Sequence, residues 1–310
     1  MKKFLLNALS VLTTVFLTVT AIFAQAAKPA ATAPVKTTAA ANETAHALLY
    51  KISGKNLKKP SYVFGTIHII CPNDMFSMEK LSGYLDQTDQ LVMELDMDNT
   101  AEMQAMGAGL VMPDGKTLKD FLNAEQFAKV DEMFKNYMGM SAENVKQVKP
   151  AFLAIMLAAS PKVLGCAPGS YEKSLLEAAV AKKKGVEGLE TTASQFAVFD
   201  KMPLEKQAKD LYEMAANPQK SFDQFKALIA TYKQQNSDAL YETINAQAGD
   251  DKEFKTNLLD NRNIDWVPKL EKAMTERASF IAVGGGHLGG KKGVLNLLRE
   301  KGYKIEAIKL

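Results

Sequence analysis

The stretch YVFGTIH at residues 62–68 ends a short apolar run with the pattern Gly-x-x-His. A second stretch, FIAVGGGH at residues 280–287, ends in the same pattern near the other end of the chain. Apolar runs of this length predict buried β-strands, and α/β folds place ligands and chemistry at strand ends. Of the 3 histidines in the chain, His68 and His287 take these matching positions. We therefore expect two imidazoles at one site, because histidine is a common metal ligand and a general acid or base.

Further apolar runs predict the rest of a sheet. Strands are expected at residues 48–52, 90–95, 186–190 and 304–308. The run at 48–52 alternates weakly between apolar and polar residues, which is typical of an edge strand. A helix expected at residues 78–85 separates the first Gly-x-x-His strand from the strand at 90–95, so the order of elements is that of a βαβ-like unit.

Helical periodicity dominates two long regions of the chain, at about residues 100–165 and 192–276. Strand patterns are missing from both regions. The sequence therefore predicts an α/β (α+β) fold, with a mixed β-sheet core and large helical insertions, in a single domain over residues 48–310.

The N-terminus has the pattern of a secretory signal peptide over residues 1–26. Lys2 and Lys3 precede a mostly apolar run, and Ala24-Gln25-Ala26 fits an A-x-A cleavage site. An uncleaved membrane anchor is the alternative, because the run is about as long as a spanning helix. Residues 27–47 are rich in Ala, Thr, Pro and Lys and predict a disordered linker. We expect an exported protein, periplasmic or extracellular.

The charge balance gives no reason to expect nucleic acid or membrane partners after cleavage. The formal net charge is +3, and loss of the two lysines of the signal segment lowers it to +1. A near-neutral chain has little electrostatic attraction for phosphate backbones or anionic lipids.

The chain contains 2 cysteines, Cys71 and Cys166. In an exported protein an even count favours a disulfide. Such a bridge would restrain the loop that follows His68, and the long loop it closes corresponds to about 4 to 5 kcal/mol in the chain-entropy model. Two buried free thiols are the alternative.

Polar residues with metal-binding or acid–base chemistry lie at the ends of four of the expected strands. They are His68, Glu94, Glu190 and His287. A buried carboxylate or imidazole is costly without a partner, and two histidines with one or two glutamates suit a divalent metal with an open coordination position. Salt-bridged acids at strand ends are the alternative for either glutamate.

Arg262 is the expected cation of the site. It lies late in the second helical region, in the segment NLLDNRN at residues 257–263. A guanidinium there is suited to clamping a substrate carboxylate or phosphate, or to orienting a catalytic glutamate. The alternative is a surface arginine paired with Asp260 or Asp265.

Four blocks in order resemble the TraB/GumN family, which includes the pheromone-shutdown proteins and is related to the Tiki metalloproteases of animals. They are YVFGTIH at 62–68, GLET at 188–191 with Gln195, LDNRN at 259–263, and AVGGGHL at 282–288. The resemblance implies an EreA/ChaN/Tiki-like α/β core with a large helical insertion and two Gly-x-x-His motifs facing one site. It also implies that Arg262 matches the arginine of the family, and that Glu172 stands where members often carry an aspartate.

Residues and resemblance together predict an exported metal-dependent hydrolase, peptidase-like, that acts on a peptide or protein with Mn, Co or Zn as cofactor. The expected roles are metal binding for His68, His287 and Glu94, catalysis for Glu94, Glu190 and Arg262, and substrate binding for Arg262 and Glu172. The alternative is a non-catalytic extracellular protein that binds or sequesters a peptide, for which the Met-rich helical region offers an adaptable apolar surface.

Overall fold

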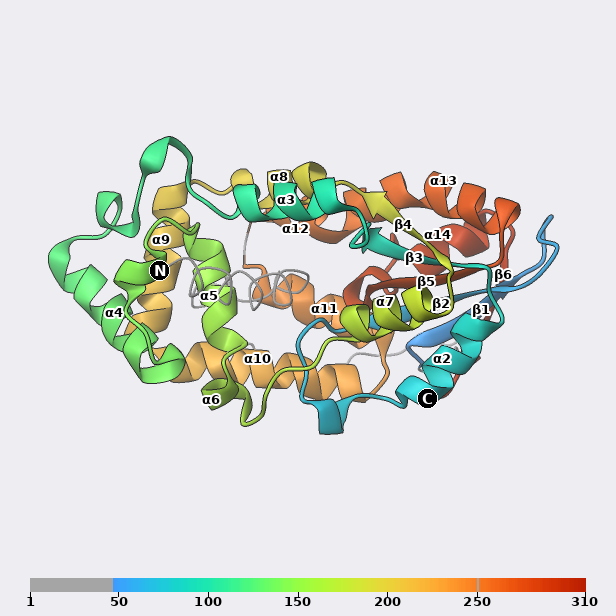
Figure 1. Ribbon diagram of the computed structural model, residues 1–310, viewed down its shortest axis with the longest axis horizontal. Helices are drawn as coiled ribbons and strands as arrows, with labels where there is room; N and C mark the ends of the chain where they lie inside the picture. Colours follow the sequence, from blue (N-terminus) through green and yellow to red (C-terminus); the bar gives the residue numbers. More distant parts are fainter. Residues whose placement is uncertain (1–46, 250) are drawn as a thin grey trace, which may run out of the picture.

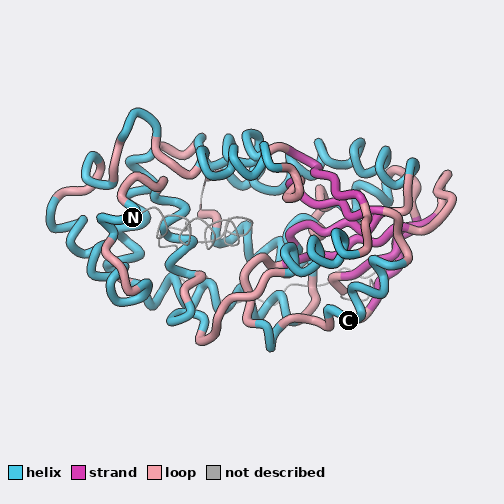
Figure 2. The backbone as a smooth tube through the Cα atoms, viewed as in Figure 1, coloured by secondary structure: helices cyan, strands magenta, loops and turns pink. Residues whose placement is uncertain are grey.

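A six-stranded mixed sheet forms one end of the molecule (Figures 1 and 2). The computed structural model describes residues 47–249 and 251–310, so the expected signal peptide, His46 and nearly all of the expected linker lie outside the described residues. The sheet order is β4-β3-β5-β2-β1-β6. The strands are β1 (Leu49–Ser53), β2 (Ser61–Thr66), β3 (Gln90–Leu95), β4 (Gly185–Glu190), β5 (Ser279–Gly284) and β6 (Lys304–Ile308).

Two pairing modes meet in this sheet. Strands β4, β3, β5 and β2 run parallel, whereas β1 is antiparallel to both β2 and β6. The four parallel strands therefore end at the same edge, which positions the site. The prediction that the run at 48–52 is an edge strand was wrong, because β6 arrives from the far end of the chain and pairs with β1. Alternation along one strand cannot reveal such a distant partner.

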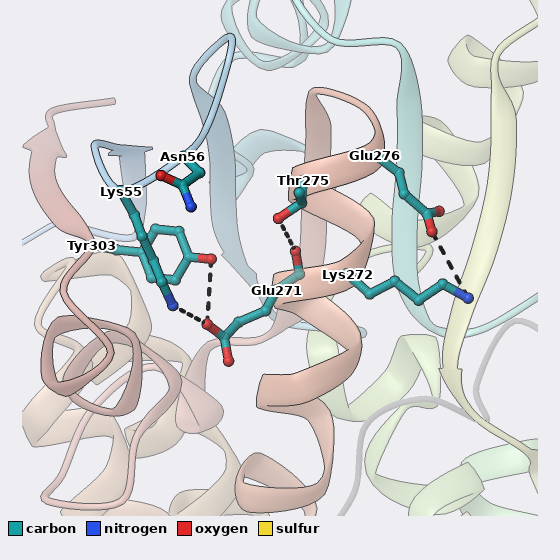
Figure 3. A pocket seen from close by; sticks show the side chains of 7 residues that line it. All are labelled: Lys55, Asn56, Glu271, Lys272, Thr275, Glu276 and Tyr303. Atoms are coloured by element: carbon teal, nitrogen blue, oxygen red, sulfur yellow. Dashed lines mark hydrogen bonds and ion pairs between the residues drawn. The ribbon is translucent and has the colours of Figure 1, made fainter.

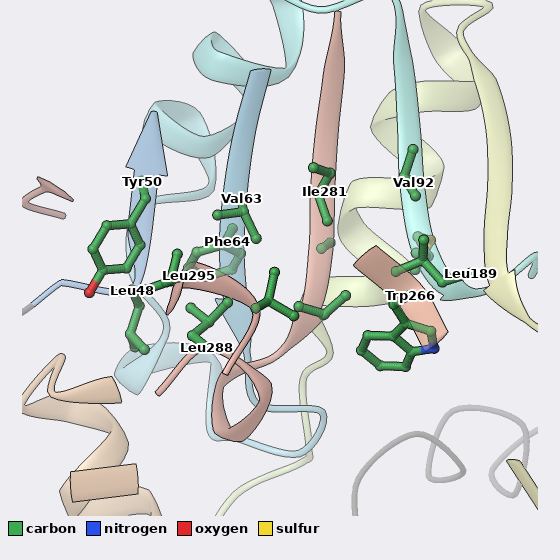
Figure 4. Packing of buried hydrophobic residues seen from close by; sticks show 14 of the residues in the cluster. Leu48, Tyr50, Val63, Phe64, Val92, Leu189, Trp266, Ile281, Leu288 and Leu295 are labelled. Carbon is green, nitrogen blue, oxygen red and sulfur yellow. The ribbon is translucent and has the colours of Figure 1, made fainter. Parts of the chain in front are cut away.

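The central strands are buried on both faces. Every residue of β2 and β3 is buried, as expected for parallel strands that helices cover on two sides. Helices α2 (Met78–Asp86) and α7 (Tyr171–Ala181) cover one face, and α13 (Asn261–Glu276) and α14 (Val294–Glu300) cover the other. Figure 4 shows Val63, Ile281 and Val92 side by side on neighbouring strands, with Trp266 and Leu288 packed nearby.

The remaining α-helices extend beside the sheet (Figure 1). They are α3 (Thr100–Gly109), α4 (Ala124–Met138), α5 (Pro150–Ala158), α6 (Pro161–Leu164), α8 (Thr192–Asp200), α9 (Leu204–Ala216), α10 (Pro218–Lys233), α11 (Ser237–Gln247) and α12 (Lys252–Lys255). Most of them share a second apolar core, whereas the buried apolar residues of α11 and α12 pack into the core of the sheet. Every residue of α5 is buried. The predicted α/β class and its long helical regions are confirmed, while the assignment of residues 48–310 to one domain stays a prediction.

No helix within the described ranges is long and apolar enough to cross a membrane. Cys71 and Cys166 form a disulfide that joins the loop after β2 to the loop before α7. Next to it, Ile70 and Gly169 pair as an isolated antiparallel bridge, with Gly169 N–H donating to Ile70 O at 2.8 Å. The alternative of two free thiols does not hold. A disulfide is consistent with an oxidising compartment.

Candidate functional site

The parallel strands bring all four predicted strand-end residues to one edge of the sheet. His68 follows β2, His287 ends the short 3-10 turn η6 (Gly285–His287) after β5, and Glu94 and Glu190 lie in the last two positions of β3 and β4. His68, Glu94 and His287 are each at most 7% exposed. The structure thus places two imidazoles from distant parts of the chain near one glutamate, while the roles expected of these residues stay predictions.

Glu94 lies at the centre of the cluster. Its Oε1 accepts the backbone N–H of Gly284 at 2.7 Å and lies 3.8 Å from His287 Nε2. A Cβ built on Gly284 would be 3.2 Å from that oxygen and 3.7 Å from His68 Nε2. Glu94 and the two imidazoles thus face one small space above Gly284.

Arg262 binds both glutamates from the opposite side. Its Nη2 donates to Glu94 Oε2 at 2.6 Å and to Glu190 Oε1 at 2.5 Å, and its Nε donates to both Glu190 oxygens at 3.2 Å. Its Nη1 donates to Leu258 O and to His287 Nε2, each at 3.1 Å. Arg262 is only 9% exposed, so it is not a surface arginine paired with Asp260 or Asp265.

The chain approaches Arg262 through an unusual helix. Residues Thr256–Asp260 form a π-helical turn, η5, that leads directly into α13. Such turns insert an extra residue per turn and often accompany functional sites. Here the turn places Leu258 O under the guanidinium of Arg262. Helical periodicity alone did not reveal this turn.

Both imidazoles have a partner on Nδ1. His287 Nδ1 lies 2.6 Å from Asn263 Oδ1, and His68 Nδ1 makes a short hydrogen bond with Glu172. Glu172 is 2% exposed and also accepts the Ser170 hydroxyl at 2.9 Å. Glu172 therefore contacts the site through His68, and its predicted role in substrate binding stays a prediction.

Two contacts were not anticipated from the residue pattern. Gln195 Nε2 donates to Glu94 Oε2 and to Glu190 Oε1, each at 3.1 Å, and so links the two carboxylates. The ring of Trp266 lies 4.4 Å from that of His287 and 4.7 Å from the Arg262 guanidinium. Gln195 and Asn263 stand inside the quoted sequence blocks, and that was the only signal that could have marked them.

The charged network shifts the pKa values of Glu94 and Glu190 in opposite directions. Burial opposes ionisation of Glu94, but Arg262 and the imidazoles overcome it and lower the pKa of Glu94 to about 2. Burial raises the pKa of Glu190, only partly offset by Arg262, and the negative charge of Glu94 raises it further. Burial, assisted by Arg262, lowers the pKa of His287 to about 3. Glu94 is thus anionic and His287 neutral near pH 7.

Glycines allow the two motifs to approach one another. A Cβ on Gly65 would lie 2.7 Å from Leu288 Cδ1 and 2.9 Å from Gly285 Cα. A Cβ on Gly286 would lie 2.3 Å from Ile244 Cδ1. Gly65 is therefore required by the close approach of the two motifs, whereas the close contact of Gly286 is with the end of the Ile244 side chain.

A pocket of about 260 Å³ opens beside the ion pairs. It is lined by Glu190, Ser194, Ala197, Val198, Lys201, Asn257, Asn261, Arg262, Asp265, Trp266 and Lys269. Two of the predicted site residues, Glu190 and Arg262, thus border a space that a ligand can reach. A second pocket, of about 390 Å³, lies between Lys55, Glu271 and Tyr303 (Figure 3) and contains none of the predicted residues.

The donor types at the site fit a divalent metal in part. His68 Nε2, His287 Nε2 and Glu94 Oε1 are imidazole and carboxylate donors of the kind that Mn, Co and Zn accept. Across residues 47–249 and 251–310, however, no group of three such residues has the spacing of a metal site. Arg262 donates to His287 Nε2, so His287 can join a metal only by exchanging that hydrogen bond.

A mixed sheet that delivers two Gly-x-x-His histidines, two glutamates and a buried arginine to one edge defines an α/β protein with a polar site at its parallel strand ends. The family model of TraB/PrgY/gumN matches residues 48–307, and the chain therefore belongs to the TraB/PrgY/gumN family. This confirms the resemblance seen in the motifs. No curated protein and no solved structure matches the chain.

Proposed function

We propose that this protein is an exported metal-dependent hydrolase with peptidase-like activity. The observation that carries the proposal is the approach of His287 Nε2 to within 3.8 Å of Glu94 Oε1, with both side chains only 5% exposed. His68 faces the same space. All three groups are buried, the pKa values of Glu94 and His287 are strongly shifted, and perturbed titratable groups cluster at functional sites.

In this proposal His68, His287 and Glu94 hold the divalent ion. Such an ion polarises a carbonyl and lowers the pKa of bound water. Glu94 is suited to holding a cation because its low pKa keeps it anionic. His287 is suited because its low pKa keeps its imidazole neutral. The ion is Mn, Co or Zn, which accept mixed imidazole and carboxylate ligands.

Glu190 is the proposed proton carrier. Its raised pKa brings proton uptake and release closer to neutral pH than is usual for a glutamate, and it borders the pocket. Arg262 holds Glu190 and Glu94 in place and stabilises negative charge that develops on a substrate carbonyl oxygen. A peptide would reach both residues through the pocket between α8 and α13.

The proposal is tested by elemental analysis of the purified protein, beside assays on a mixed peptide library with added Mn, Co or Zn. We expect about one equivalent of metal and peptide cleavage in the wild type, and loss of both in His68→Ala and His287→Ala. In Glu190→Gln metal is retained and cleavage falls by 100-fold or more, on the order of a lost general acid or base. His46→Ala is the matched control. Equal metal in all forms would refute the metal site.

The second candidate, a peptide-binding protein without catalysis, has one observation in its favour. Arg262 already neutralises Glu94 and Glu190 and satisfies His287 Nε2, so the site is hydrogen-bonded without any ion. A binder of this kind would take up no metal, cleave nothing, and retain its peptide after His68→Ala. The same purified variants therefore separate the two candidates.

A further inference from the structure

The orientation of Asn263 is fixed by a backbone group. Asn263 is fully buried, and its Nδ2 donates to Lys292 O at 2.9 Å. A carbonyl oxygen only accepts hydrogen bonds, so the amide nitrogen must face Lys292 and Oδ1 must face His287. Oδ1 also only accepts, and at 2.6 Å the hydrogen between it and His287 must therefore be carried by Nδ1 of the ring.

The other side of the same ring leads to the same assignment. Arg262 Nη1 lies 3.1 Å from His287 Nε2, and a guanidinium only donates. Nε2 must therefore present a lone pair. Two independent partners thus define one neutral tautomer of His287, and the Trp266 ring packed against the imidazole holds its plane.

His68 is held by a different group in the same way. Its Nδ1 meets Oε1 of Glu172, whose other oxygen accepts the Ser170 hydroxyl. A carboxylate only accepts, so Nδ1 of His68 carries a proton. Ser170 is also the N-cap of α7, where it accepts the N–H of Lys173 at 3.3 Å. The start of α7 is therefore built to present Glu172 to His68.

We infer that Asn263 and Glu172 are matched positioning residues, each holding the Nδ1–H of one imidazole so that Nε2 of each ring presents its lone pair to the polar cluster around Glu94 and Arg262. What those lone pairs bind rests on the proposed function, whereas the tautomers themselves do not. Partners of this kind on the second ring nitrogen set the orientation of metal-binding histidines. The two partners differ in charge, so His68 and His287 are not interchangeable.

The first test is the nitrogen-15 NMR spectrum of the imidazoles at neutral pH, which is simple because the chain has 3 histidines. We expect His287 as the Nδ1–H tautomer, with an Nδ1 proton that exchanges slowly with water. The signal should persist in Asn263→Asp, which keeps an acceptor, and be lost in Asn263→Leu. An Nε2–H tautomer in the wild type would overturn the inference.

The second test is binding of MnCl₂ or CoCl₂ alone to the same proteins. Losing a partner of a metal-binding histidine typically weakens affinity about 10- to 100-fold, and we expect that loss in Asn263→Leu but not in Asn263→Asp. Asn296→Leu is the matched control, because Asn296 donates to Lys291 O in the same loop and contacts neither imidazole.

The outcomes separate the two proposals. Wild-type affinity and an unchanged Nδ1–H signal in a folded Asn263→Leu protein would refute the positioning role. If the wild type binds no metal, the proposed function fails, and the NMR spectrum still decides the tautomer. If Asn263→Leu does not fold, the wild-type spectrum and the Asn263→Asp protein provide the test.

Discussion

Arg262 is a buried cation shared by two carboxylates. Its guanidinium reaches Glu94 and Glu190 at 2.6 and 2.5 Å, and all three side chains are at most 10% exposed. For such a buried ion pair, the net contribution to stability is much smaller than the cost of removing one partner. A buried ion pair adds little to stability compared with a well-packed apolar core, yet removal of one partner leaves an uncompensated charge in a poorly solvated place.

We therefore predict that Arg262→Met lowers the free energy of unfolding by about 3 to 5 kcal/mol, the usual cost of breaking a buried pair. Urea denaturation followed by circular dichroism measures the change. Arg277→Met is the control, since Arg277 pairs with Glu187 on the surface, where a lost pair changes stability by about 0 to 1 kcal/mol. Equal effects of the two substitutions would contradict the assignment of Arg262 as a buried charge.

His287 makes the stability of the protein depend on pH. Burial lowers its pKa from 6.5 to about 3 in the folded state, so between these values the unfolded chain binds the extra proton. Stability is thus lost as pH falls below 6.5. Between pH 7 and 5 we expect the wild type to lose about 2 kcal/mol that His287→Gln does not lose. Urea denaturation at both pH values measures the difference, and a parallel loss in His287→Gln would contradict it.

The strand-end residues and Arg262 were predictable from the sequence, whereas the link that Gln195 makes between the two glutamates was not. His68, Glu94, Glu190 and His287 stand out because each follows or ends an apolar run, and parallel strands end at a common edge. Gln195, in contrast, neither follows nor ends an apolar run. Its role depends on the packing of α8 beside β3 and β4, which no local pattern encodes.

At the scale of elements, the strands were the easiest to predict. The predicted bounds of β3 and β6 agree with the structure. β3 is a short, buried apolar run, whereas β6 is a partly exposed strand in which apolar and polar residues alternate. The π-helical turn before Arg262 was not predictable, since its residues fit an ordinary helix. Neither was the inner position of β1, which depends on a partner more than two hundred residues away.

The two Gly-x-x-His elements pack too closely for a side chain between them. Gly65→Ala would place a methyl group 2.7 Å from Leu288 Cδ1 and 2.9 Å from Gly285 Cα. We expect a loss of about 1 to 3 kcal/mol in unfolding free energy, the usual cost of overpacking. Thermal unfolding of Gly83→Ala is the matched control. That glycine lies inside α2 with open space around it, and the same change should stabilise by about 0.4 to 1 kcal/mol.

The disulfide joins two elements that carry a histidine and its partner. Cys71 lies three residues after His68, and Cys166 lies six residues before Glu172. Its sequence separation of 95 corresponds to about 4 to 5 kcal/mol of chain entropy. Cys71→Ala should lower the unfolding free energy, measured by urea denaturation, by a comparable amount. Dithiothreitol should lower the unfolding free energy of the wild type and leave that of Cys71→Ala unchanged. Insensitivity of the wild type to the reductant would contradict this role.

At the scale of the whole molecule, the disulfide is consistent with export, and the signal segment stays a prediction. Expressed with its own N-terminus, the protein should begin after Ala26 and contain no free thiol. Expressed from residue 27 in the cytoplasm, it should contain two free thiols, because that compartment keeps cysteines reduced. Intact mass after maleimide labelling measures both properties. Two free thiols in the exported form would contradict the localisation.

The strand order of the sheet also determines when the site can form during synthesis of the chain. Strand β2 pairs with β5, and β1 with β6, so the early strands acquire these neighbours only after the helices from α3 to α12 have been synthesised. A nascent chain that has emerged as far as α10 holds His68, Glu94 and Glu190 but neither Arg262 nor His287. An incomplete chain that ends before Arg262 and His287 therefore cannot form the complete cluster. A fragment that lacks the last fifty residues likewise lacks Arg262 and His287.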